Sequence, residues 1–447
     1  ATDGDGASGT ATATLTIGEA PVTPTPTAVP GTVVVSQGYG ATGSTIRVDV
    51  SDPADVKMVP KSAFPGMPPA FATAINSPRT RSANVAVADI DGDGTKDMVV
   101  GFGPGGFGAD FPSSVVAWTP TGGGDEGDRP SVITAKNVFN PNAPIDAYKN
   151  VHGALNLAAG MFFSDQTLPM IVAAQGLGGS NQIALLQYAE ETDGDQTKKK
   201  LNIVATFQGL TGGAVQLNTS GGTSVATGDV DGDGLDELIV GQMNGASATT
   251  LFQVVDLQKV DGNITVQRRT AAIQAMPNAA FFGEGGVNLT VGDVDGDGDQ
   301  DIVTATAGDA TGANSPDLKN FVRVFQVATD DQNRITTISQ LTGPIQILGS
   351  NVNSSGGIDV VCGNADTDVA DEVIVSAQAL ISLDTDTGEV SFTETPFGGN
   401  NYYKVWNLNF ADGVYSGKDA ATPLLRAFQG EFAPTSGSLF VEMMPAN

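Results

Sequence analysis

Cysteine and histidine are almost absent from this sequence, which contains one residue of each, Cys362 and His152. A single cysteine excludes an intrachain disulfide, so an exported chain would need another staple, such as a bound ion. A single histidine excludes a multi-histidine zinc site and leaves a Ser-His-Asp triad dependent on one side chain. We interpret His152 as a loop residue and Cys362, in an apolar segment, as a small core residue.

Basic residues are also scarce, because 21 Lys and Arg stand against 50 Asp and Glu and give a formal net charge of -29. This balance disfavours nucleic acid and anionic membranes as partners. No run of about 18 apolar residues occurs, so we predict no transmembrane helix and no membrane insertion. An excess of carboxylates suits divalent cations or a salty exterior.

Glycine, by contrast, is abundant at 57 residues, and hydrophobic residues make up 40% of the chain, enough for a sizeable core. Glycine together with Val, Ile and Thr favours many short strands joined by tight turns. No segment shows a sustained helical period. These features predict an all-β fold.

Internal repeats organise most of the chain. Three segments align without gaps: VAVADIDGDGTKDMVVG from Val85, SVATGDVDGDGLDELIVG from Ser224 and LTVGDVDGDGDQDIVTA from Leu289. A fourth, VVCGNADTDVADEVIVS from Val360, keeps the frame without the glycines. The spacing predicts a further repeat near position 161, where LNLAAGMFFSDQTLPMIVAAQG keeps the flanking strands but lacks the acidic loop.

Each repeat is predicted to form four strands, A to D, with the acidic loop between A and B. In the second copy these strands are Ser224–Thr227, Glu237–Gly241, Thr249–Leu257 and Ile264–Ile273. Four antiparallel strands per repeat are typical of a propeller blade. We therefore predict a β-propeller of four-stranded antiparallel blades, with six blades favoured and seven as the alternative, because residues 379–423 are long enough to contain extra strands.

The two ends of the repeat region complement one another. Residues 32–63 contain B, C and D strands without an A strand, whereas Ser438–Met443 form a surplus A strand. We predict that these N- and C-terminal strands share one blade and close the ring, which removes an exposed sheet edge.

The N-terminal residues do not match the repeats. We interpret residues 1–20 as a lone strand that belongs to a preceding domain or is donated to a neighbour, because a single strand is not stable alone. Residues 21–30 form a Pro/Thr-rich linker, and residues 31–447 form the propeller. The chain begins at Ala1 without an apolar leader, which we interpret as a mature product or a fragment of a longer protein.

The acidic loops share the pattern D-x-D-G-D-G-x-x-[DE]. Carboxylates at positions 1, 3, 5 and 9 converge if the loop coils tightly, and the position-7 carbonyl adds an oxygen. Hard oxygen ligands in a flexible loop select calcium. The candidate ligands are Asp89, Asp91, Asp93, Thr95 and Asp97; Asp229, Asp231, Asp233, Leu235 and Glu237; Asp293, Asp295, Asp297, Asp299 and Asp301; and, in a weaker fourth copy, Asn364, Asp366, Asp368, Ala370 and Glu372.

Two other interpretations of the loops are less suitable. An EF-hand requires Glu at position 12, where this chain has Val100, Val240, Thr304 and Val375, and its flanks should be helical. A solvated acidic turn would explain one copy, but not four copies in one frame. We predict calcium at three strong sites and a fourth weaker one, with a structural role.

These segments resemble FG-GAP/VCBS repeats, the blades of integrin α-subunit propellers and of many bacterial surface proteins. The resemblance covers about Gly31 to Met444 and includes a partial Phe-Gly/Gly-Ala-Pro signature at Gly101-Phe102-Gly103-Pro104. It implies a propeller braced by loop calcium ions, with the ligands at the positions just named. Separately, TDGDGASGTATATLTI at the N-terminus resembles the closing strand of Ig-like repeats in bacterial adhesins.

Three function classes follow. The first is a secreted, calcium-stabilised adhesion or interaction module at a bacterial cell surface, with a protein, a glycan or copies of itself as partner. The second is a structural subunit of an extracellular filament or surface assembly, formed through pairing of residues 1–20. The third is a propeller enzyme such as a polysaccharide lyase; we expect no enzyme, because no Lys or His cluster with facing carboxylates marks a site.

Two further groups have ordinary explanations. We interpret Lys198, Lys199 and Lys200 as part of a solvated turn rather than a patch for polyanions. The aromatic residues Trp118, Trp406, Tyr402 and Tyr403 suit packing between strands better than a sugar-binding surface.

Overall fold

The computed structural model describes the chain in segments. These are residues 32–37, 45–49, 57–58, 83–94, 96–102, 114–119, 131–136, 138, 155–176, 180–194, 196–211, 222–243, 250–276, 286–307, 320–348, 357–366, 368–377, 380–383, 390–394, 402–420, 425–426 and 439–444. They contain strands and turns, and none of them includes a helix that is long and apolar enough to cross a membrane. The predictions for residues 1–30 and for His152 lie outside these segments.

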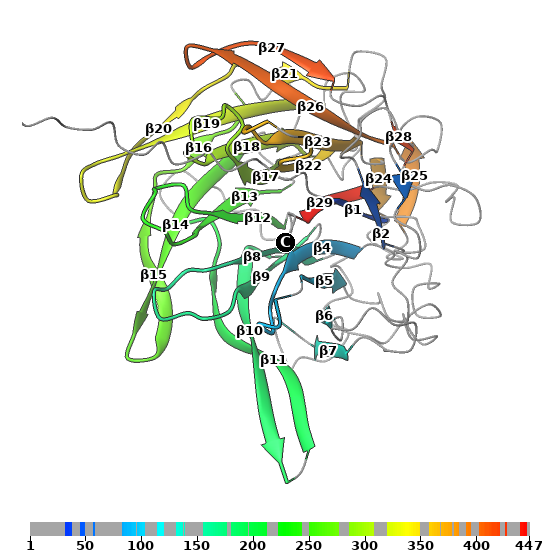
Figure 1. Ribbon diagram of the computed structural model, residues 1–447, viewed down its shortest axis with the longest axis vertical. Coiled ribbons are helices and arrows are strands. Elements are labelled where there is room, and N and C mark those ends of the chain that lie inside the picture. The colour runs from blue at the N-terminus through cyan, green and yellow to red at the C-terminus, as the bar shows by residue number, and fades with distance from the viewer. Residues whose placement is uncertain are drawn as a thin grey trace, which may run out of the picture.

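The fold is an all-β propeller of four-stranded antiparallel blades (Figure 1). Five blades are described with side chains. Their strands, in order A to D, are β4 (Ala83–Ala88), β5 (Asp97–Phe102), β6 (Ser114–Thr119) and β7 (Ser131–Lys136); β8 (Leu155–Gly160), β9 (Met170–Gln175), β10 (Gln182–Asp193) and β11 (Gln196–Gln208); β12 (Thr223–Gly228), β13 (Glu237–Gln242), β14 (Leu251–Val260) and β15 (Asn263–Arg269); β17 (Val287–Gly292), β18 (Asp301–Thr306), β19 (Phe321–Thr329) and β20 (Ile335–Gln340); and β22 (Ile358–Gly363), β23 (Glu372–Ala377), β26 (Tyr402–Ala411) and β27 (Val414–Ala420).

Short strands extend three of these sheets. They are β16 (Ile273–Gln274), β21 (Ile345–Gln346) and β28 (Leu425–Arg426), which pair with the C strands β14, β19 and β26. Between β23 and β26 the hairpin of β24 (Leu380–Leu383) and β25 (Val390–Glu394) pairs only within itself among the described residues. The extra strands expected in residues 379–423 therefore include a separate hairpin together with the C and D strands of the same blade.

One further four-stranded sheet joins the two ends of the chain. It has the order β29-β1-β2-β3 and is described by its backbone pairing, with β1 at Thr32–Gln37, β2 at Thr45–Asp49, β3 at Lys57–Met58 and β29 at Leu439–Met444. The register pairs Thr32 with Met444 and Gln37 with Leu439. The predicted pairing of the C-terminal strand with the N-terminal strand is confirmed. The predicted number of blades stays a prediction and is taken up below.

The A strands line the centre of the molecule. β4 lies against β8, β8 against β12, β12 against β17, β17 against β22, β22 against β29, and β29 against β4. The second residues of the A strands link neighbours, because Asn156 Nδ2 donates to the Thr223 carbonyl at 2.7 Å and Asn288 Nδ2 to the Ile358 carbonyl at 2.7 Å. A central cavity of about 430 Å³ is lined by residues of β4, β8, β12, β17 and β22.

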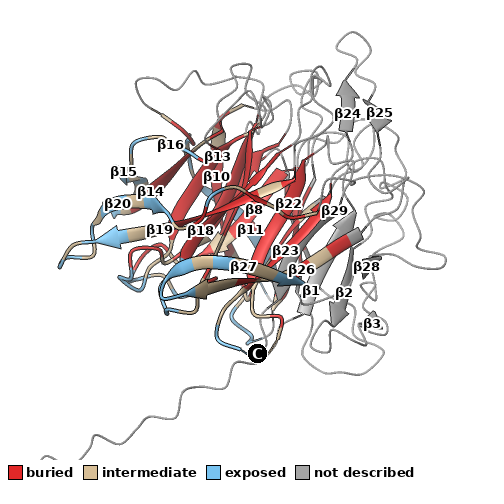
Figure 2. Cartoon of the chain, turned by 90° about the horizontal axis from the view of Figure 1, so that it is seen from above, coloured by how far each residue is buried: buried red, intermediate tan, exposed pale blue. Residues whose placement is uncertain are grey.

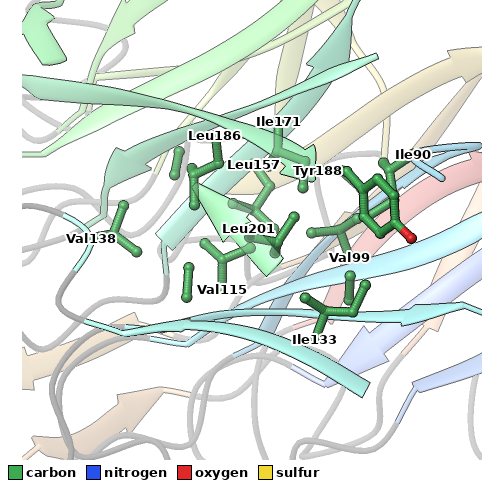
Figure 3. Packing of buried hydrophobic residues seen from close by; sticks show 14 of the residues in the cluster. Ile90, Val99, Val115, Ile133, Val138, Leu157, Ile171, Leu186, Tyr188 and Leu201 are labelled. Atoms are coloured by element: carbon green, nitrogen blue, oxygen red, sulfur yellow. The ribbon is translucent and has the colours of Figure 1, made fainter. Parts of the chain in front are cut away.

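In the blade of β12 to β15, burial decreases outward from the B strand to the D strand (Figure 2). All six residues of β13 are buried, because a B strand faces a neighbouring blade on each side. In contrast, β15 alternates exposed and intermediate residues. The core therefore lies between blades: Leu157, Ile171 and Leu186 of one blade pack against Val99 and Val115 of the preceding one (Figure 3). Continuous apolar B strands and alternating D strands are the sequence signals of this arrangement.

Candidate metal centres in the blade loops

Four acidic loops connect the A and B strands of their blades. The first loop is residues 89–97, the second 229–237, the third 293–301 and the fourth 364–372. In the first loop the glycines at positions 4 and 6 have φ values of 79° and 84°, and those of the second and third loops are also positive. These left-handed glycines allow the tight coil that the sequence predicts.

The position-1 carboxylate holds the coil closed. Asp89 accepts hydrogen bonds from Gly92 N at Oδ1 (2.8 Å) and from Gly94 N at Oδ2 (3.0 Å). Asp229 and Asp293 make the same two bonds in their loops. The position-1 aspartate therefore shapes the loop as well as adding charge.

Later carboxylates also accept backbone hydrogen bonds. Asp231 Oδ1 accepts from Asp233 N at 3.2 Å, and Asp233 Oδ1 accepts from Leu235 N at 2.9 Å. At position 9, Glu237 Oε2 accepts from Val230 N at 3.0 Å, and Asp97 Oδ2 accepts from Ile90 N at 2.8 Å in the first loop. Each carboxylate is thus oriented by the chain around it.

Three carboxylates per loop lie together, with one oxygen of each within 4.8 Å of the others. The groups are Asp89, Asp91 and Asp97; Asp229, Asp231 and Glu237; Asp293, Asp295 and Asp297; and Asp366, Asp368 and Glu372. Among the described candidates, Asp93, Asp233, Asp299 and Asp301 fall outside these groups. Thr95 lies outside the described residues. The amide of Asn364 donates to the Asp368 carbonyl at 2.7 Å instead of belonging to an acidic group.

An ionised carboxylate that is buried without a partner lowers the stability of the folded protein. Asp97 is fully buried and Asp301 is 3% exposed, and Asp97 Oδ1 and Asp301 Oδ2 have no hydrogen-bond partner. Burial, together with neighbouring aspartate charges, raises the pKa of Asp97 to about 7 and that of Asp301 to about 8. A buried carboxylate oxygen without an N–H donor needs a proton or a cation.

Burial also raises the pKa of the position-9 carboxylate in the second and fourth loops. Burial is the first cause that raises the pKa of Glu237 to about 9 and that of Glu372 to about 8, and nearby carboxylates add to it. All of these donors are hard oxygen atoms, which is the ligand set that calcium prefers. The residues present therefore fit the calcium ions that the repeat pattern implies.

Residues 221–252, which hold β12, the second loop and β13, match the family model of the FG-GAP repeat. The chain is an FG-GAP β-propeller. No curated protein sequence matches it. The match covers one repeat of this FG-GAP propeller; the other blades share its strand order, and three of them also carry an acidic group in the loop between their A and B strands.

In two blades of the FG-GAP propeller, a polar C-strand residue that the sequence pattern does not identify lies beside the acidic loop. Burial is the first cause that raises the pKa of Asp231 and of Glu237, and the charge of Asp256 in β14 adds to both shifts. At the equivalent place in β26, Asn407 Nδ2 donates to Asp366 Oδ2 at 3.2 Å. The sequence signal is an acidic residue directly after the buried Val254 and Val255, and only the strand register relates it to the loop.

Position 8 of the loop fastens neighbouring blades together. Asp371 Oδ2 accepts from Asp293 N at 3.0 Å, and Asp371 N donates to the Asp293 carbonyl at 2.7 Å. Asp236 makes the equivalent pair of bonds to Met161. Gly292 is the last residue of the A strand β17, and a Cβ on it would lie 2.8 Å from Asp371 Oδ2. The glycine therefore leaves room for these two hydrogen bonds.

The loop of residues 161–169 replaces acidic groups with one amide. Gln166 Nε2 donates to the carbonyls of Gly160 and Leu168, both at 2.8 Å, and Gln166 Oε1 accepts from Phe162 N at 2.9 Å. Phe162 and Phe163 are buried beneath it. The neutral side chain of Gln166 therefore holds this loop closed, together with the buried rings of Phe162 and Phe163.

We expect Gln166→Ala to destabilise the protein by about 1–3 kcal/mol, because it leaves partly buried backbone groups without partners. Since Gln166 belongs to the loop without an acidic group, the loss should be the same with calcium and with chelator. Urea denaturation in both conditions measures it, and Asp165→Ala, which removes an exposed partner of Lys259, is the matched control. A loss confined to one condition would contradict this role.

The cysteine and the aromatic residues singled out from the sequence pack against other parts of the fold where the structure describes their side chains. Cys362 is buried, and burial raises the pKa of its thiol, which supports the interpretation as a core residue. Tyr403 is 1% exposed, as expected for a packing aromatic, and the centre of the Trp406 ring lies 4.2 Å from the ammonium of Lys404 and 4.3 Å from that of Lys418. The side chains of Trp118 and Tyr402 lie outside the described part of the chain.

Proposed function

We propose that this FG-GAP propeller is a secreted, calcium-stabilised interaction module at a cell surface. The observation that supports it most is the recurrence of a three-carboxylate group in four blades, with a buried carboxylate in each of three groups at position 9. Calcium in the loops would be held by these groups and would neutralise their mutual repulsion. The ions brace the hairpin between strands A and B and leave the binding of partners to exposed loops.

The described ring carries this proposal, whereas an assembly built on residues 1–20 would depend on residues outside the described segments. We propose six blades, because the A strands of six sheets contact one another in a closed order. A closed ring with braced loops presents a rigid surface, which reduces the entropy lost when a partner binds. The ring thus suits a recognition domain.

Calcium titration and surface labelling test the proposal. Isothermal titration of the full chain with calcium chloride should show binding at more than one site. Antibody against the chain should label intact, unpermeabilised cells of the source organism. Binding of no calcium would refute calcium stabilisation, and labelling only after permeabilisation would refute the surface location.

The stability of the calcium-free protein should decrease as pH rises. The folded-state pKa values of Asp97, Asp301 and Glu237 lie above those of the unfolded chain. Folding therefore retains protons, and the stability present below about pH 4 is lost as pH rises through about 7 to 9. Calcium requires the ionised carboxylates, so the difference in melting temperature between calcium and chelator should be small at pH 5 and should grow as pH rises to about 9. Calorimetry across this range checks it, and a pH-independent difference would contradict it.

A further inference from the structure

One loop carboxylate already has a cationic partner from another blade. Lys199 in β11 places its Nζ 3.0 Å from Asp91 Oδ2. The side chain of Asp91 is 5% exposed and that of Lys199 is 32% exposed, so the pair is partly shielded from water. Asp91 belongs to the same group as Asp97, whose Oδ1 is buried without a hydrogen-bond partner.

Packing of the β10–β11 hairpin against the first loop positions Lys199. Tyr188 and Leu201 of the hairpin share a buried cluster with Ile90 of the first loop, and Figure 3 shows Tyr188 beside Ile90. The Tyr188 hydroxyl donates to Glu190 at 2.6 Å, and the Lys199 ammonium lies 5.8 Å from the centre of the Tyr188 ring. The long hairpin extends outward from its blade (Figure 1). Lys199 is thus fixed on the first loop by its surroundings.

The neighbouring lysines and the second loop differ from this arrangement. Lys198 pairs with Asp193, and Lys200 pairs with Glu191, both within the same hairpin. At the second loop, the contact from the following blade is neutral: Asn333, between β19 and β20, donates from Nδ2 to the Gly232 carbonyl at 3.0 Å. Among the described ion pairs, Lys199 provides the one ammonium on a carboxylate of the four acidic groups. This pattern distinguishes the first loop from the others.

We propose that Lys199 is a tethered cation that competes with calcium for the first loop. The inference rests on the proposed calcium binding. With calcium absent, the ammonium offsets part of the loop charge and fastens the β10–β11 hairpin to the preceding blade. Calcium at the first loop must displace it from Asp91, so the affinity of this loop is lower than that of the second and third loops, and its occupancy frees the hairpin. The first loop then responds to calcium at higher concentrations than the others do.

The test compares Lys199→Met with Lys198→Met, which removes the same charge one residue away. In calorimetric titrations with calcium chloride, Lys199→Met should tighten one site about tenfold, while Lys198→Met should match the wild type. Tyr188 packs with Ile90 of the first loop, and the centre of its ring lies 5.8 Å from the ammonium that contacts Asp91. Terbium emission excited through Tyr188 therefore reports on the first loop and should show the same shift. In chelator, Lys199→Met should melt at a lower temperature than Lys198→Met.

Unchanged affinity in a folded Lys199→Met protein that binds calcium would overturn the competition while leaving the proposed function intact. Absence of calcium binding in the wild type and in both variants would refute the proposed function instead. If Lys199→Met does not fold, Lys199→Gln is titrated in its place, and failure of both to fold would show that the lysine is a structural requirement rather than a competitor.

Discussion

Chelation of calcium is expected to lower the melting temperature of this protein by roughly 9 °C near pH 8. At free calcium about 100 times the dissociation constant, each site that binds only the folded state adds about 2.7 kcal/mol, so three loops add about 8 kcal/mol. For 447 residues, an unfolding entropy of about 2.1 cal/mol/K per residue amounts to about 0.9 kcal/mol/K. Their ratio gives the expected shift, which scanning calorimetry measures.

Substitutions divide this effect among the loops. Asp91→Ala, Asp231→Ala and Asp295→Ala each remove one member of an acidic group. Asp231→Ala and Asp295→Ala should each reduce the calcium-dependent shift by about 3 °C, and Asp91→Ala should reduce it by less, because Lys199 competes with calcium in the first loop. Asp165→Ala changes an aspartate in the loop that Gln166 closes and should leave the shift unchanged. Magnesium should restore stability poorly, because it requires a stricter octahedral geometry. The same melting curve in calcium and in chelator would show that these loops are ordinary acidic turns.

The sequence predicts the strands around the loops well because two periodic signals coincide there. In the second repeat, the predicted Glu237–Gly241 strand corresponds to β13 at Glu237–Gln242, and the predicted Ser224–Thr227 strand to β12 at Thr223–Gly228. Buried B strands are continuous apolar runs, and the Asp-Gly pairs between them fix the turn. The hidden repeat near position 161 was predictable for the same reason, since β8 and β9 keep their apolar residues.

The parts of the site that come from other strands could not be predicted in this way. Asp256 approaches the second loop because the register pairs Val255 with Leu238, and no local pattern contains that register. Lys199 reaches Asp91 from the next blade, and in the sequence it is one of three adjacent lysines. The third loop shows a limit of the motif itself, because its acidic group contains Asp297 at position 5, whereas the first loop uses Asp97 at position 9.

Removal of residues 437–447 is expected to cause aggregation and a large loss of stability. The deletion removes β29, which pairs with all six residues of β1 and lies against β22 and β4. A ladder of this length carries about six backbone hydrogen bonds at about 1 kcal/mol each, a loss of roughly 6 kcal/mol before apolar contacts are considered. The freed edge of β1 (TVVVSQ) begins with four β-branched residues and carries no charge, which favours pairing between molecules.

Removal of residues 445–447 alone is the matched control, because it leaves β29 complete at Leu439–Met444. Size-exclusion chromatography should show oligomers that grow with concentration for the longer deletion and a profile like that of the full chain for the shorter one. Chemical denaturation should give a lower midpoint only for the longer deletion. A soluble and equally stable protein without residues 437–447 would contradict closure by β29, because no other described strand pairs with that edge of β1.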